Sequence, residues 1–167
     1  MSDIKIVSDS AVLTKKIAKT FIADVLKKKK GPHMFLLKGD LGSGKTAFVL
    51  GALSHFGIRP KAASPTFVLM KHYKTGTRGK GLGVRGKNSD IYHVDAYRLR
   101  SKKDFNELHV PGLYQGPASI SRPGLNRQIV FIEWPEQVKF RAPKGAFIIK
   151  FSHGSHISKR IIEISRK

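Results

Sequence analysis

Residues 39–46 have the types and the spacing of a loop that binds phosphate. The segment GDLGSGKT fits the pattern G-x-x-x-x-G-K-[ST]. Glycines let successive backbone N–H groups turn inward around an anion. Lys45 would then reach the β- and γ-phosphates, and the Thr46 hydroxyl would ligate Mg²⁺. The pattern predicts a site for a nucleoside triphosphate with Mg²⁺, and we expect the following residues to line it: Asp40, Leu41, Gly42, Ser43, Gly44, Lys45, Thr46 and Ala47.

Two acids complete the predicted site. Of the eleven Asp and Glu residues, only Asp95 and Glu133 directly follow an apolar run that could be a buried strand. Ligands bind at the carboxyl ends of parallel strands, so both acids would lie beside the phosphate loop. We predict that Asp95 coordinates Mg²⁺, and that Glu133 orients or deprotonates the attacking water or contacts Mg²⁺. The plainer alternative is that each carboxylate caps the next turn.

A third candidate is the segment Ser64-Pro65-Thr66, which lies between the predicted phosphate loop and the next strand. Nucleotide hydrolases often carry a loop there that senses the γ-phosphate. A hydroxyl of Ser64 or Thr66 could make that contact, although an ordinary Ser-Pro turn explains the same residues equally well. We keep Thr66 as a candidate nucleotide contact.

The elements that must position these residues alternate between strands and helices. Apolar periodicity predicts helices that end near residue 30 and span 45–56, and a short helix over 101–108 with Ser101 as its N-cap. Strands are predicted over 4–7, 33–38, 67–73, 91–95, 129–133, 145–151 and 156–164. This order predicts an α/β fold. We expect residues 1–167 to form a single P-loop NTPase-like domain with a central mixed, largely parallel sheet flanked by helices.

Composition narrows the class of protein. The 167 residues contain no cysteine, which excludes disulfides and thiolate metal sites. The sequence shows neither a signal peptide nor an apolar run of about 20 residues, so we expect a cytoplasmic protein without a membrane span. Thirty-two Lys and Arg give a formal net charge of +21. That charge favours polyanionic partners such as nucleic acid, but a proteome that is basic as a whole explains it equally well.

Four segments in this order resemble the TsaE (YjeE) family. They are GDLGSGKTAF (39–48), SPTF (64–67), YHVDAYRL (92–99) and IEWPE (132–136), and the resemblance covers roughly residues 5–165. The family consists of bacterial ATPases of the tRNA threonylcarbamoyladenosine pathway. The resemblance implies a small α/β domain that binds ATP and Mg²⁺ and hydrolyses ATP slowly. It also implies TsaD and TsaB homologues as partners, which transfer the threonylcarbamoyl group to tRNA while this protein resets the complex.

The resemblance also implies roles for single residues. Lys45 and Thr46 match the phosphate and Mg²⁺ residues, Asp95 matches the acidic residue of the metal site, and Glu133 matches the second acid needed for hydrolysis. Thr66 takes the threonine position of the switch-like segment. The resemblance is imperfect at Ala47, where a threonine or serine is common.

Two regions depart from the family pattern. The basic, glycine-rich insertion 74–90 and the enlarged loop 111–127 could contact tRNA phosphates, or they could be solvated loops specific to one lineage. Two other functions stay open. A small-molecule kinase would need a lid with arginines, for which Arg122 and Arg127 are candidates. A basic RNA-binding module with a vestigial P-loop would need no hydrolysis, but the insertion has no aromatic ring on which a base could stack.

Overall fold

The computed structural model describes residues 3–28, 33–59, 69–75, 89–110, 127–156 and 158–167. Seven strands in this part of the chain form one sheet, in the order β1-β7-β6-β2-β5-β4-β3. The strands are β1 (Ile4–Ser8), β2 (His33–Lys38), β3 (Met70–Thr75), β4 (Ser89–Asp95), β5 (Arg127–Glu133), β6 (Phe147–His153) and β7 (Arg160–Arg166). The helices are α1 (Ala11–Lys28), α2 (Lys45–His55) and α3 (Lys102–Glu107).

The centre of the sheet is parallel and its two margins are antiparallel. Strand β2 pairs in parallel with both β5 and β6, and β5 pairs in parallel with β4. The outer pairs β1–β7, β6–β7 and β3–β4 are antiparallel. This confirms the predicted mixed α/β sheet, whose parallel pairs are all in its centre.

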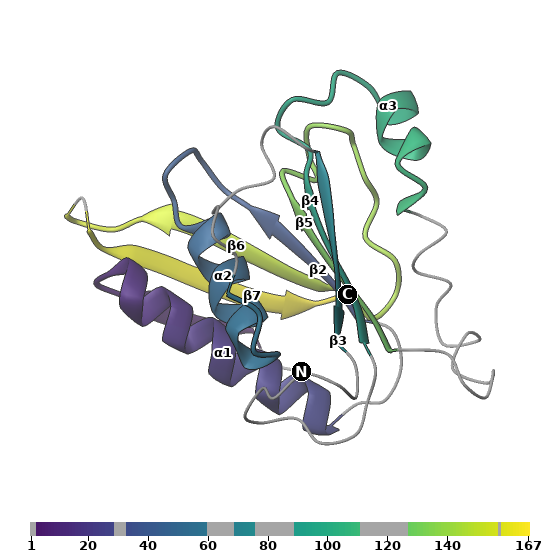
Figure 1. The fold of residues 1–167 in the computed structure, drawn as a ribbon. Helices are drawn as coiled ribbons and strands as arrows, with labels where there is room; N and C mark the ends of the chain where they lie inside the picture. Colours follow the sequence, from purple (N-terminus) through teal and green to yellow (C-terminus); the bar gives the residue numbers. More distant parts are fainter. Residues whose placement is uncertain (1–2, 29–32, 60–68, 76–88, 111–126, 157) are drawn as a thin grey trace.

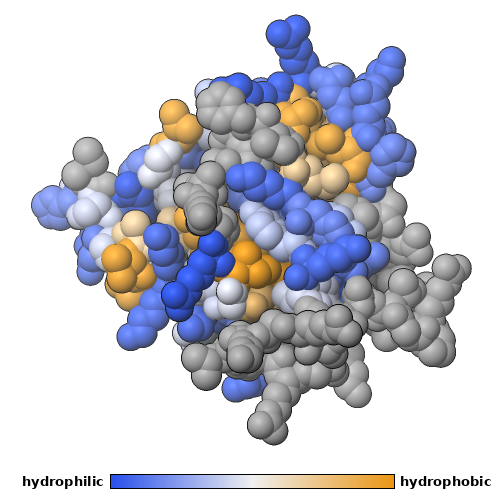
Figure 2. Space-filling model, in the orientation of Figure 1, coloured by the Kyte–Doolittle hydropathy of each residue, from blue (hydrophilic) through white to orange (hydrophobic). Residues whose placement is uncertain are grey.

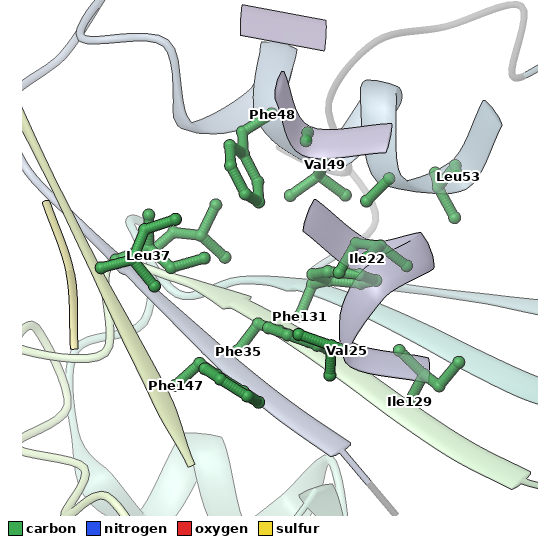
Figure 3. Packing of buried hydrophobic residues seen from close by; sticks show 14 of the residues in the cluster. Ile22, Val25, Phe35, Leu37, Phe48, Val49, Leu53, Ile129, Phe131 and Phe147 are labelled. Carbon is green, nitrogen blue, oxygen red and sulfur yellow. The ribbon is translucent and has the colours of Figure 1, made fainter. Parts of the chain in front are cut away.

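The helices cover both faces of the sheet. Helices α1 and α2 lie side by side across one face, and α3 is set apart from them beyond the end of β4 (Figure 1). Under α1 and α2, the rings of Phe131 and Phe147 stack on Phe35, with centroids 4.9 and 5.2 Å away (Figure 3). Phe105 of α3 is buried in a second cluster on the opposite face, with Leu36 and Val130. The central strands are therefore buried on both faces, as their apolar runs predict.

The predicted element boundaries are shifted by a few residues. Strands β6 and β7 begin at 147 and 160 rather than at 145 and 156, whereas the predicted start of β3 at residue 67 lies outside the described residues. The shift of β7 has a local cause, because the N–H of Gly154 donates to the carbonyl of Lys159 and closes a turn where we expected the strand to begin. Helix α1 ends at Lys28, and residues 29–32 lie outside the described part.

Side chains cap the starts of α1 and α3, and the cap at Ser101 is the predicted one. The Ser10 hydroxyl accepts a hydrogen bond from the N–H of Leu13 at the start of α1. Ser101 and Asp104 form a reciprocal capping box at the start of α3. No helix in the described ranges is long and apolar enough to cross a membrane.

Candidate nucleotide and magnesium site

The loop between β2 and α2 has the backbone geometry of a phosphate cradle. Gly39, Gly42 and Gly44 have φ angles of 136°, 73° and 104°. Residues other than glycine rarely adopt such positive φ angles. Gly44 is the N-cap of α2 and, as a glycine, offers no side chain to cap the helix. The first N–H groups of α2 therefore have no capping side chain to satisfy them, which is the arrangement that binds anions at helix N-termini.

Lys45 is buried inside this loop although it carries a charge. Its Nζ donates to the carbonyls of Gly39 at 2.6 Å and Asp40 at 2.8 Å, and lies 3.7 Å from the centre of the Trp134 ring. Burial lowers the pKa of the Lys45 ammonium, and the nearby carboxylates, Glu133 first, oppose that effect. The ammonium is thus held at the loop by two carbonyl dipoles and a ring face.

The two predicted acids reach the same edge of the sheet as the loop. Glu133 is in register with Leu37 of β2 and with Asp95 of β4, so the three strand ends are aligned. Ile91 and Ile129, an even number of positions before Asp95 and Glu133, are buried under α1 and α2. Since side chains alternate between faces, both acids point to the face on which α2 begins. Their exposures are only 5% for Asp95 and 2% for Glu133.

A chain of hydrogen bonds joins the phosphate loop to Glu133. The Thr46 hydroxyl donates to Oε2 of Glu133 at 2.9 Å. The other carboxylate oxygen, Oε1, lies 2.7 Å from Nε2 of His93, which is 1% exposed. A hydroxyl that gives its hydrogen to a carboxylate keeps its oxygen lone pairs for a cation. The Thr46 oxygen therefore has lone pairs left for a cation, and Glu133 holds the hydroxyl from behind.

Asp95 faces the same space by a different arrangement. Its Oδ1 accepts a hydrogen bond from the N–H of Tyr97 at 3.1 Å, as in a strand-end cap. The carboxylate also lines the cavity that contains Lys45 and Thr46. Asp95 therefore caps the turn after β4, as the plainer alternative predicts, and it also lies where a site residue would lie.

A cavity lies between the phosphate loop and the two acids. Its volume of about 690 Å³ lies within the range of small-molecule sites in proteins. Four parts of the chain line it: the phosphate loop and α2, the ends of β4 and β5, the start of α1, and the start of β7. The lining residues are Ser10, Ala11, Thr14, Leu41, Gly42, Gly44, Lys45, Thr46, Ala47, Asp95, Tyr97, Glu133, Trp134, Ser158 and Arg160.

The residues present fit Mg²⁺ that arrives with phosphate. No cluster of three or more His, Asp or Glu side chains in the described ranges could hold a metal by itself. Mg²⁺ is typically held by one or two carboxylates together with substrate phosphates and water, so such a cluster is not required. The buried Ser43 hydroxyl has no hydrogen-bond partner in the described structure. It can therefore still form a hydrogen bond with a ligand inside the loop.

Some of the remaining predicted residues lie in the described part of the chain and others do not. Leu41 at the loop tip is 73% exposed, and Asp40 contributes its main-chain carbonyl to Lys45 and to the N–H of Ser43. Thr66 and Ser64 lie outside the described residues, as does Arg122 of the kinase hypothesis. Arg127 lies at the start of β5, about 20 Å along the strand from Glu133, and does not line the cavity.

Comparison with known proteins assigns the family. The family model described as threonylcarbamoyl adenosine biosynthesis protein TsaE matches residues 8–162. The chain belongs to the TsaE family. The TsaE protein of Rickettsia felis is 37% identical over 127 residues, which are 75% of this chain and 59% of that protein. The TsaE protein of Rickettsia typhi is 35% identical over 127 residues, which are 75% of this chain and 70% of that protein.

A solved structure has the same fold. The crystal structure of YdiB from Bacillus subtilis superposes with a TM-score of 0.62 and covers 99% of this chain and 86% of its own. The sequences of the two proteins are 21% identical, so this likeness concerns the fold alone.

Two residues of this TsaE-family site were missed by sequence reasoning. His93 lies inside the segment YHVDAYRL, where the sequence patterns predict only a strand. Arg160 comes from β7 and donates through Nε to the carbonyl of Gly42 in the phosphate loop at 3.2 Å. The period-two alternation that directs Asp95 to the site also directs His93 to the same face, and so could have identified it. Nothing in the local sequence around Arg160 indicates its place.

Proposed function

We propose that this TsaE-family chain binds ATP with Mg²⁺ and hydrolyses it slowly, as an accessory protein of tRNA threonylcarbamoyladenosine formation. The supporting observation is the hydrogen bond from Thr46, in the phosphate loop, to Glu133, which is 87 residues away in the chain. A structural loop would not need a buried carboxylate behind its threonine. The pathway follows from the family and from the names of the rickettsial relatives.

In this proposal, different groups of the site bind the phosphates, bind the metal and activate the water. The loop amides and Lys45 hold the phosphates, and the Thr46 hydroxyl oxygen and Asp95 face the place of the metal. Glu133 has the position to orient the attacking water or accept its proton. Mg²⁺, when bound with ATP, supplies the positive charge that offsets the charge on the phosphoryl oxygens.

Binding is tested by calorimetric titration of Mg-ATP into the wild type and into Lys45→Ala. We expect the variant to bind about 100-fold more weakly, because it loses charge-assisted hydrogen bonds to phosphate. Lys150→Ala is the matched control, since Lys150 is exposed on β6 and does not line the cavity. Equal affinity of Lys45→Ala and wild type would contradict the proposal.

The reaction type is tested by product analysis. Release of inorganic phosphate without an acceptor supports hydrolysis, whereas transfer of phosphate to a small metabolite at ordinary kinase rates would favour the kinase alternative. Failure of Mg-ATP to raise the unfolding temperature would favour the RNA-binding module with a vestigial loop.

The proposed partners are TsaD and TsaB homologues, in the cytoplasm. A pull-down with these proteins from the same source, with and without ATP, tests the assignment. We expect capture that depends on nucleotide. Absence of capture under both conditions would contradict the proposed partners while leaving ATP binding intact.

A further inference from the structure

We propose that His93 is a positioning residue that fixes the carboxylate of Glu133 for hydrolysis, through a hydrogen bond from Nε2–H to Oε1. The inference rests on the proposed function and deepens it, since it concerns the same site. Neither the family comparison nor the sequence patterns give this side chain a role.

The first argument is burial. His93 and Glu133 are 1% and 2% exposed, and their contact of 2.7 Å is short. A buried carboxylate needs donors at its oxygens, because water does not solvate it there. Among the described residues, the Thr46 hydroxyl donates to Oε2, and Nε2 of His93 lies within hydrogen-bond distance of Oε1. Loss of His93 would leave one oxygen of a buried anion without that donor.

The second argument is the register of the sheet. In the parallel β4–β5 pair, His93 is opposite Phe131, and Asp95 is opposite Glu133. His93 therefore lies two residues back from the strand end on the face of the two acids, where its ring reaches diagonally toward Glu133. The main chain of Glu133 is also held, since its carbonyl accepts from the N–H of Ala96. The strands thus fix the backbone, and His93 fixes the end of a side chain with three rotatable bonds.

The third argument concerns the proton on the ring. An ionised carboxylate can only accept hydrogen bonds, so the Nε2 atom beside Glu133 must carry the hydrogen. Hydrogen bonds at both oxygens fix the orientation of the carboxylate plane as well as the position of the carboxylate. Small errors in the placement of a catalytic group cost rate rather than substrate binding when the group does not hold the substrate. The expected signature is a loss in kcat with little change in nucleotide affinity.

The decisive variants are His93→Gln and His93→Asn. The glutamine amide nitrogen can replace Nε2, whereas the same group on asparagine is one methylene shorter and falls short of Oε1. We expect His93→Gln to keep most of the hydrolysis rate. His93→Asn should lose about 10- to 100-fold in kcat and keep its dissociation constant for Mg-ATP within about threefold. Thermal unfolding of each variant establishes that it is folded.

Two outcomes of the kinetic comparison would overturn the proposal. Wild-type turnover in both variants would show that the hydrogen bond does not serve hydrolysis. Equal loss in both variants, with turnover tracking stability, would show that His93 only supports the fold.

An NMR measurement separates this proposal from the proposed function. Two-bond ¹H–¹⁵N spectra of the wild type without nucleotide report which ring nitrogen of His93 is protonated. We expect a proton on Nε2, and its resonance should move in Glu133→Ala. A bare Nε2 would overturn the positioning role whether or not the protein hydrolyses ATP. Conversely, a protonated Nε2 in a protein without ATPase activity would contradict the proposed function.

Discussion

The Thr46 hydroxyl has a single hydrogen, and in the structure that hydrogen points to Glu133. The motif alone indicates that Thr46 is a metal ligand, but it does not say what holds the hydroxyl in place. The contact with Glu133 supplies that constraint, because the oxygen then presents its lone pairs away from the carboxylate. At the scale of single residues, therefore, the acid at the end of β5 and the threonine at the start of α2 act as one unit.

Removing this hydroxyl should separate folding from activity. Thr46→Val keeps the shape of the side chain but loses the oxygen, and we expect hydrolysis to fall about 100-fold or more because one ligand of Mg²⁺ is gone. Thr46→Ser keeps the oxygen and should stay within about tenfold of the wild type. Phosphate release measured across a Mg²⁺ titration tests both values. Equal rates for valine and serine would contradict the role of the hydroxyl.

Helices α1 and α2 approach each other at a glycine. A Cβ atom at Gly51 would lie 2.2 Å from the carbonyl oxygen of Lys15 in α1, so the two backbones are in contact there. In a helix interior, Ala is favoured over Gly by about 1 kcal/mol. The close packing of α2 against the backbone of α1, rather than helix propensity, thus explains why a glycine fits in the middle of α2.

Gly51→Ala should therefore destabilise the protein. We expect the free energy of unfolding to fall by about 1–3 kcal/mol, because overpacking against a backbone outweighs the gain in propensity. Urea denaturation measures this change. A stabilised Gly51→Ala would show that α1 and α2 can move apart at little cost.

The helices and strands could be predicted from the sequence, but the contacts between distant ones could not. Periodicity identified the type of each described element, and the carboxyl-end rule predicted that Asp95 and Glu133 lie at one edge. The roles of these residues stay predictions. The contacts of Gly51 and Arg160 depend on elements far apart in the chain, α1 with α2 and β7 with the phosphate loop. Local patterns carry no information about such pairs, so they could not be predicted.

For the whole molecule, the two ends of the parallel strands carry different groups. Asp95 and Glu133 lie at the carboxyl ends of β4 and β5, whereas His33 and Arg127 lie at the amino ends of β2 and β5. On the face that Figure 2 shows, most of the coloured side chains are hydrophilic, with apolar patches between them. Burial, with Arg127 as a secondary cause, lowers the pKa of His33 from 6.5 to about 4. His33 is thus neutral in the folded protein near pH 6, where the unfolded chain binds a proton.

Stability should therefore depend on pH through His33. Its contribution is fully present above pH 6.5 and is lost as the pH falls toward 4, because the unfolded state then binds more protons. The loss is on the order of 3 kcal/mol as an upper bound. Urea denaturation from pH 7.5 to 4.5 measures it, and His33→Phe should show a weaker slope. His156→Gln, at an exposed position, should keep the wild-type slope. Identical slopes for all three proteins would contradict this account.

The ring of Trp134 lies over the ammonium of Lys45, and it is the chain's single tryptophan. Its indole emission therefore originates at one place, beside the Lys45 ammonium. A ligand that draws Lys45 out from under the ring changes the electric field on the excited indole. The protein thus carries a built-in optical probe of its own pocket, and no dye or label need be attached.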